Sequence, residues 1–76
     1  MNKFYIVQYM GLSLQMNNTG HVFTNDLNSA NRFEFKQHAF YWIKASEDEH
    51  MNLPYWLDVV ECELIDGEWK FTVVEE

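Results

Sequence analysis

Residues 60–73 read Val60-Glu61-Cys62-Glu63-Leu64-Ile65-Asp66-Gly67-Glu68-Trp69-Lys70-Phe71-Thr72-Val73. Asp66-Gly67 between two alternating runs is the strongest short hairpin signal, because both residues tolerate the positive φ angles of a type I′ turn. Pairing outward from this turn puts the apolar side chains on one face, namely Val60, Cys62, Leu64, Trp69, Phe71 and Val73. The other face receives Glu61, Glu63, Lys70 and Thr72, as a correct register requires. We therefore predict a β-hairpin whose apolar face, Trp69 included, is buried.

The N-terminal third also alternates in the manner of strands. Residues 3–10 are rich in β-branched and aromatic side chains, and Leu12, Leu14 and Met16 alternate with polar residues. Gly11 marks a bend or bulge between these two strands, and residues 17–20 have the Asn and Gly of a turn. Residues 21–24 complete a three-stranded meander. Thr24 and Asn25, followed by Asp26, Leu27 and Ala30, predict a capped single helical turn that closes on Phe33.

One amphipathic helix separates the meander from the hairpin. At 100° per residue, one stripe holds Phe35, Ala39, Trp42, Ile43 and Ser46, and the opposite side holds Gln37, Tyr41 and Lys44. The acids 47–49 end the helix because they oppose its dipole, and Pro54 ends the loop that follows. The expected fold class is α+β, a β-β-β-α-β-β antiparallel sheet of about five strands. The helix is expected to lie across the apolar face of this sheet, which in the hairpin is the face of Cys62 and Trp69.

Length and composition limit the chain to one small domain, residues 1–76. Such a domain buries only about 60% of its unfolded surface, and the 47% hydrophobic content supplies the dense core it needs. Cys62 is the single cysteine, which excludes an internal disulfide and a cysteine zinc cluster and fits a reducing cytoplasm. No stretch approaches the ~20 apolar residues of a membrane span. We read the apolar N-terminus as a strand and not as a signal peptide.

The histidines, the cysteine and the glutamates do not form a catalytic pattern. His21, His38 and His50 lack the i, i+4 spacing of a helical metal pair, and strand alternation turns Cys62 inward. Glu61 and Glu63 are expected to point to solvent rather than into a pocket that would raise the pKa of one of them. The sequence therefore predicts no catalytic residue, no metal site and no cofactor.

The charge is distributed unevenly along the chain. Residues 1–46 carry two acids and four bases, a net charge of +2, whereas residues 47–76 carry ten acids and Lys70, a net charge of −9. Such a surface repels nucleic acid and lipid headgroups and attracts basic protein surfaces. Residues i and i+2 of a strand lie roughly 6.6–6.8 Å apart, so Glu61 and Glu63 could imitate a row of phosphates. The candidate partner-binding acids are Glu47, Asp48, Glu49, Asp58, Glu61, Glu63, Asp66 and Glu68. A solvated face that only keeps the protein soluble is an equally weighted explanation.

Two other functions use the aromatic residues. In the first, exposed Tyr41, Tyr55 and Trp56 mediate self-association, which would give a structural or assembly protein or a homodimer. In the second, Phe40, Tyr41 and Lys44 stack on single-stranded nucleic acid, although four bases in 46 residues make a weak electrostatic attraction. An enzyme ranks behind protein binding.

Part of the chain resembles a known group of proteins. The segments Tyr5-Ile6-Val7, Gly11, Phe23-Thr24-Asn25-Asp26-Leu27-Asn28-Ser29-Ala30-Asn31-Arg32-Phe33 and Ala39 resemble a pattern in small uncharacterised phage and prophage proteins of Gram-positive bacteria. In those proteins a strand pair leads to an F-T-x-D-L-x-x-A-x-x-F stretch, a helix and a final strand. The resemblance covers about the first half and implies a fold and an origin, with no functional residues carried over.

These patterns together predict a non-enzymatic, acidic, protein-binding protein in the cytoplasm. With the implied phage origin, it would be an accessory inhibitor that binds a host protein with a basic, nucleic-acid-handling surface, acting as a DNA mimic. Direct binding to nucleic acid or to a membrane is not expected.

Overall fold

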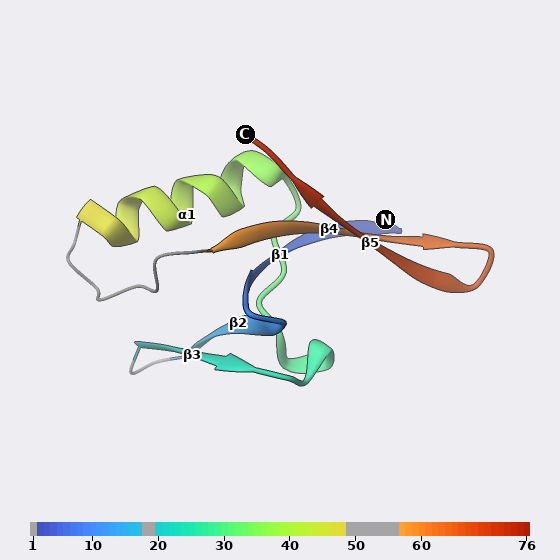
Figure 1. Cartoon of the computed structure of the whole chain (residues 1–76), viewed down its shortest axis with the longest axis horizontal. Coiled ribbons are helices and arrows are strands. Elements are labelled where there is room, and N and C mark those ends of the chain that lie inside the picture. Colours follow the sequence, from blue (N-terminus) through green and yellow to red (C-terminus); the bar gives the residue numbers. More distant parts are fainter. Residues whose placement is uncertain (1, 18–19, 49–56) are drawn as a thin grey trace.

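The computed structural model describes residues 2–17, 20–48 and 57–76. An antiparallel sheet is formed by β1 (Lys3–Tyr9), β2 (Leu12–Asn17), β3 (Gly20–Thr24), β4 (Asp58–Ile65) and β5 (Glu68–Val74), in the order β3-β2-β1-β4-β5. The 3₁₀ turn η1 (Leu27–Ser29) and the helix α1 (Lys36–Asp48) lie between β3 and β4. Figure 1 shows α1 on one side of the sheet and the β4–β5 hairpin projecting beyond the other elements. The expected α+β fold with five strands and one helix is confirmed.

The hairpin forms in the expected register. Ile65 pairs with Glu68, and the pairing continues residue by residue to Val60 opposite Val73. Asp66 and Gly67 have φ angles of 52° and 80°, the positive values of a type I′ turn. A similar two-residue turn joins β1 to β2, where Tyr9 pairs with Leu12 and Met10 and Gly11 have φ angles of 49° and 81°. Gly11 therefore lies in a tight turn and not in a bulge.

The connection from η1 to α1 passes between two strands of the sheet. Strands β1 and β2 pair next to their turn and then diverge. In the gap, the Asn31 N–H donates to the Leu14 carbonyl of β2 at 2.8 Å. Phe33 and Tyr5 of β1 exchange two backbone hydrogen bonds, both of 2.8 Å. The chain thus crosses from one face of the sheet to the other while its backbone polar groups stay paired.

Two buried clusters lie on opposite faces of the sheet because of this crossing. The face reached by η1 carries a cluster of Phe4, Ile6, Ala30, Val60 and Cys62, with Leu27 packed against it. The face covered by α1 carries a cluster of Val7, Leu14, Ala39 and Val59, bordered by Tyr5, Phe23, Phe33, Phe40, Trp42, Ile43, Leu57 and Val74. Both faces of β1 and β4 are therefore buried at the centre of the sheet.

The expected side for the helix is wrong. The sequence predicts that α1 covers the face of Cys62 and Trp69, but Ala39 of α1 packs with Val7 and Val59 on the opposite face. The face of Cys62 is covered at its centre by the short η1 segment, which does not extend over β5. Trp69 is consequently exposed, although its register is the expected one.

The helix follows the expected stripe except at its first member. Ala39 and Ser46 are buried, and Trp42 and Ile43 pack against the same cluster, whereas Gln37, Tyr41 and Lys44 are exposed. Phe35 lies before the first helical residue and is exposed. Its carbonyl accepts the His38 N–H at 3.1 Å, and its ring contacts the His38 ring. The predicted helical turn forms as η1, with the Asp26 carboxylate accepting the Asn28 N–H as an N-cap. The expectation that it closes on Phe33 is wrong, because Phe33 bridges Tyr5 and packs in the cluster on the opposite face, under α1.

Candidate functional surface

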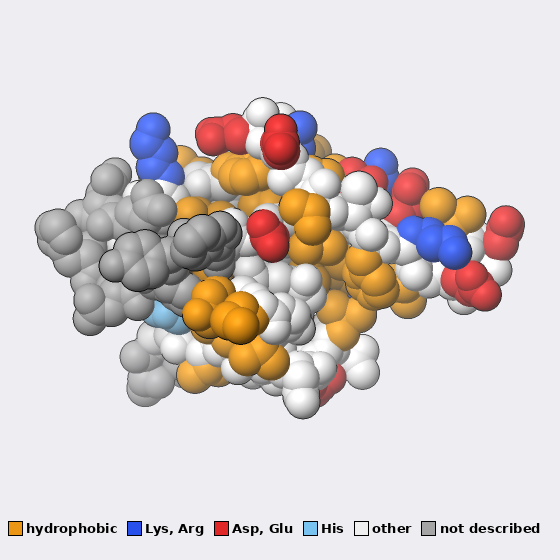
Figure 2. All heavy atoms as spheres, in the orientation of Figure 1, with side chains coloured by type: hydrophobic (Ala, Val, Ile, Leu, Met, Phe, Trp, Pro, Cys, Tyr) orange, Lys and Arg blue, Asp and Glu red, His pale blue; other side chains and the backbone are white. Residues whose placement is uncertain are grey.

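Three apolar side chains of β5 lie at the surface in a row. Trp69 is 39% exposed, Phe71 53% and Val73 61%, and strand alternation puts all three on the face away from α1. We call these side chains the β5 strip. Figure 2 shows hydrophobic side chains at the surface between charged groups in the region of β5. The Trp69 ring is anchored by an edge-on contact with Phe4, at 5.1 Å between ring centroids.

The backbone of the β5 strip also faces outward. Strand β5 is an edge of the sheet and pairs with β4 on one side. In a hairpin with a two-residue turn, the pair next to the turn exchanges hydrogen bonds, and every second residue after it points its N–H and C=O away. The Leu64 N–H agrees with this alternation, because it donates to Asn2 on the β1 side at 2.8 Å. The outward groups of β5 therefore belong to Trp69, Phe71 and Val73.

This alternation predicts a pattern of amide hydrogen exchange along β5. The amides of Lys70 and Thr72 point to β4 and should exchange slowly, whereas those of Phe71 and Val73 should exchange at least about tenfold faster, because only amides bonded in the ladder are protected. Exchange measured by NMR at residue resolution tests this. Uniform protection along the strand would mean that another segment covers the edge.

Glu61 and Glu63 are not an unbroken acidic row. Lys3 of β1 pairs opposite Glu63, and its Nζ lies 3.6 Å from Glu61 Oε1 and 3.7 Å from Glu63 Oε2. These two carboxylates raise the pKa of Lys3, with Glu61 as the larger influence. On the other side of β4, Lys70 pairs opposite Glu63 and lies 3.3 Å from Glu68 Oε2. Two lysines therefore interrupt the candidate phosphate mimic.

The expectation that Glu61 points freely to solvent is also wrong. Its side chain is 24% exposed, and its Oε2 accepts the Tyr5 hydroxyl at 3.2 Å. Burial is the main cause that raises the pKa of Tyr5, and the hydrogen bond to Glu61 acts in the same direction. Glu61 therefore connects β4 to β1 on the face of α1, and its carboxylate is engaged by Lys3 and Tyr5 of the same domain.

The remaining candidate residues do not gather at one place. Asp66 and Glu68 lie exposed at the hairpin end, whereas exposed Asp58 pairs with Gln8 at the far end of β4. Tyr41 is 74% exposed on α1, but Phe40 packs against the core, so the two aromatic side chains of the nucleic-acid alternative are not both free to stack. Glu49, Tyr55 and Trp56 lie outside the described residues, as do Pro54 and His50. Glu47 and Asp48 belong to the last turn of α1, where only their backbone is described.

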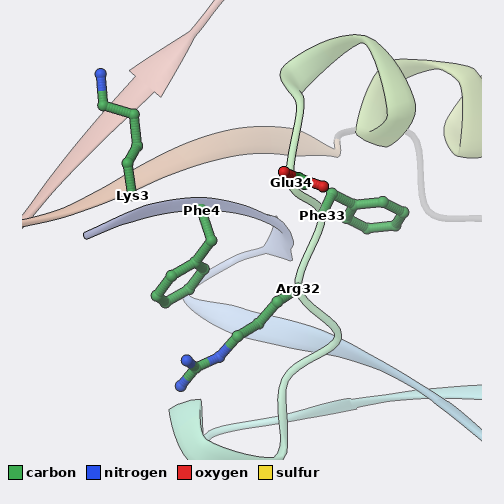
Figure 3. A pocket seen from close by; sticks show the side chains of 5 residues that line it. All are labelled: Lys3, Phe4, Arg32, Phe33 and Glu34. Carbon is green, nitrogen blue, oxygen red and sulfur yellow. The ribbon is translucent and has the colours of Figure 1, made fainter. Parts of the chain in front are cut away.

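A shallow hollow of about 330 Å³ lies beside the Phe4 ring, lined by Lys3, Phe4, Arg32, Phe33 and Glu34. Figure 3 shows the Arg32 side chain running under the Phe4 ring while Lys3 points to the other face of the sheet. The Arg32 guanidinium carbon is 4.2 Å from the Phe4 ring centroid, a cation–π contact. The lining offers no nucleophile beside a base, so the hollow has no catalytic arrangement.

The described residues contain no group of three or more His, Cys, Asp and Glu side chains that could hold a metal ion. The one helix in the described part of the chain is too short to cross a membrane. Comparisons with protein-family models, with curated proteins and with solved structures found no match to this chain. The surface itself is therefore the basis for a functional conclusion.

Proposed function

We propose that this chain acts by binding another protein through its projecting β4–β5 hairpin. The observation that carries the proposal is the β5 strip, in which three large apolar side chains lie exposed in a row. Contiguous exposed apolar groups with charged surroundings mark interaction sites, whereas single exposed apolar residues are ordinary. An exposed apolar strip favours aggregation, and a bound partner that covers the strip removes this tendency.

The charges around the strip support a basic partner. Asp66 and Glu68 lie at one end of β5, where the contact of Lys70 with Glu68 still leaves a net negative charge, and Glu75 and Glu76 follow the other end. Anionic groups placed this way attract basic protein surfaces and repel phosphate backbones and anionic lipids. Proteins that handle DNA or RNA present basic surfaces, so a host protein of this kind remains the proposed partner. The phage origin stays a prediction from the resemblance in the N-terminal half.

The contact chemistry favours a mixed apolar and electrostatic interface over imitation of DNA. A phosphate mimic needs a series of uncompensated negative charges, and Lys3 bridges the two glutamates that would supply it. The β5 strip offers apolar area instead, which contributes roughly 25 cal/mol per Å² on burial. The acids at the strand ends then steer association and exclude nucleic acid.

A matched pair of double variants tests the proposed function. The hairpin variant carries Asp66→Asn and Glu68→Gln, and the control carries Asp26→Asn and Glu34→Gln, which remove the same number of charges from exposed positions outside β4 and β5. Asparagine at position 26 keeps a residue that can cap η1. A protein captured from bacterial lysate is purified, and its binding is measured at low and physiological salt. We expect the hairpin variant to bind about fivefold more weakly, mainly through slower association, and the control to stay within about twofold of the original chain.

A third variant, Phe71→Thr, keeps strand propensity and removes exposed apolar area, and it should weaken the same complex by about tenfold or more. Equal binding by all three variants would show that the hairpin is not the contact surface. Competition by duplex DNA alone, without an effect of Phe71→Thr, would favour the mimic.

A further inference from the structure

We propose that the free edge of β5 binds an extended segment of the partner protein, which adds to the sheet as a further strand. The segment would have three alternating apolar residues that face the β5 strip and basic residues beyond both ends. This inference rests on the proposed function, and it specifies the binding mode and the chemistry of the partner.

The backbone supplies the first part of the recognition. Trp69, Phe71 and Val73 point their N–H and C=O groups outward, and no backbone hydrogen bond from the described residues reaches them. An extended peptide that lies along this edge can exchange hydrogen bonds with each of the three. Addition of a strand to an exposed sheet edge is a recurring mode of peptide recognition, in which the main chain gives affinity.

The β5 strip supplies the second part. Residues directly opposite each other in an antiparallel pair share a face, so the partner residues bonded to Trp69, Phe71 and Val73 lie beside those same side chains. Aromatic and β-branched neighbours are the favourable pairs at such positions. The edge therefore selects alternating apolar residues on the face away from α1.

The charges select the occupant. The apolar centre of β5 is flanked by Asp66 and Glu68 before it and by Glu75 and Glu76 after it. A basic residue beyond each end of the added segment would meet these acids. Lys70 lies between Trp69 and Phe71 and points to the α1 side of the sheet. The residue of the added segment next to Lys70 should therefore be polar or acidic and not basic.

A second copy of this chain is a poorer occupant for the same reason. Antiparallel pairing centred on Phe71 would place Trp69 opposite the second copy's Val73, which is favourable. The same register brings Asp66 and Glu68 next to the second copy's Glu75 and Glu76 at both ends. Centring the pair on Lys70 instead puts two lysines opposite each other, and like charges directly opposite are destabilising. Charge thus protects the edge from self-pairing while leaving it open to a basic-ended strand.

The probe is the synthetic peptide Lys-Arg-Thr-Val-Thr-Ile-Thr-Val-Arg. In antiparallel pairing its Val, Ile and Val face Val73, Phe71 and Trp69, and its basic ends meet Glu75, Glu76 and Glu68. One control replaces the Lys and both Arg with Glu. A second control methylates the backbone nitrogen of Ile, which points at β5, and a third methylates the nitrogen of the neighbouring Thr, which points away.

We expect the unmodified peptide to bind at least about tenfold more tightly than the Glu-ended peptide and the Ile-methylated peptide, because each has lost one part of the recognition. Methylation at Thr should change affinity less than about threefold. On binding, the amides of Trp69, Phe71 and Val73 should become protected from hydrogen exchange. Phe71→Thr should weaken binding by about tenfold.

Equal binding of the four peptides would overturn the inference, as would charge-dependent binding that ignores the Ile methyl group. So would a dimer in sedimentation equilibrium that Phe71→Thr dissociates, because a second copy would then occupy the edge. If the peptides fail while the charge-matched double variants still differ in partner binding, strand addition is wrong and the proposed function stands. If both experiments show no difference, both proposals fail.

Discussion

Replacing Ile6 with alanine is expected to lower the free energy of unfolding by about 2–5 kcal/mol, a large part of the stability of a domain this small. Ile6 is fully buried in the cluster with Phe4, Ala30, Val60 and Cys62. The layer above this cluster is the short η1 segment, and the connection that follows it is hydrogen-bonded to β2 through Asn31 and to β1 through Phe33. A segment held by these hydrogen bonds has little freedom to collapse into the cavity, so we expect the upper part of the range.

The matched control is Ile65→Ala, the same chemical change at a strand position that is 43% exposed. Its cost should stay below about 1 kcal/mol, because little apolar area is lost and no cavity forms. Urea denaturation followed by tryptophan fluorescence measures both variants. Similar losses for the two would mean that the face of η1 is not a tightly packed core.

The hairpin could be predicted to the residue because its information is local. Asp66-Gly67 defines the turn, and the period of two then places every side chain of β4 and β5. The same holds for the stripe of α1, where Ala39 and Ser46 are buried and Tyr41 is exposed. The prediction for Phe35 is wrong because a stripe at 100° per residue applies only within a helix, and α1 begins at Lys36.

The side of the sheet that the helix covers could not be predicted. Val59 and Val60 are both buried, on opposite faces of β4, and Ile6 and Val7 repeat this pattern on β1. A strand that is apolar on both faces does not indicate which face meets the helix. The face that α1 covers is determined by the crossing of the chain between β1 and β2. Backbone hydrogen bonds stabilise this crossing, so it leaves no pattern in the side chains.

The ion pairs of the candidate acids could not be predicted for a related reason. Charges counted along the chain put ten acids in residues 47–76, but the sheet brings Lys3 from the N-terminus between Glu61 and Glu63. The β1–β4 pairing joins residues far apart in the sequence, so counting by segment overlooks it. The exposure of the β5 strip could not be predicted from its alternation. A strand with one buried face and an edge strand whose apolar face has no covering layer show the same sequence pattern.

Cys62 is expected to react slowly with thiol reagents in the folded protein. Burial raises the pKa of its thiol from 9.0 to about 11, with the nearby Arg32 charge acting in the opposite direction. Since the thiolate is the nucleophile, the raised pKa alone lowers the reactive fraction at pH 8 by about 100-fold. The side chain is also fully buried, which adds a steric barrier. Labelling at pH 8 in native buffer and in urea gives the ratio, and a ratio below about tenfold would contradict the burial of Cys62.

The same group should make stability depend on pH in the alkaline range. The pKa is higher in the folded state, so the folded protein keeps the Cys62 proton between about pH 9 and pH 11 while the unfolded chain loses it. Stability therefore falls as pH rises through this window, by up to roughly 2–3 kcal/mol at 1.36 kcal/mol per pKa unit, and is unaffected by this group below pH 9. Lys3 and Tyr5 also titrate at high pH, so the measurement is the difference between the original chain and Cys62→Ala. The original chain should be the more stable at pH 8, and its advantage should shrink steadily towards pH 11. An advantage that stays constant over this range would mean that the Cys62 thiolate is tolerated in the fold, and the cluster around Ile6 would then be open to water.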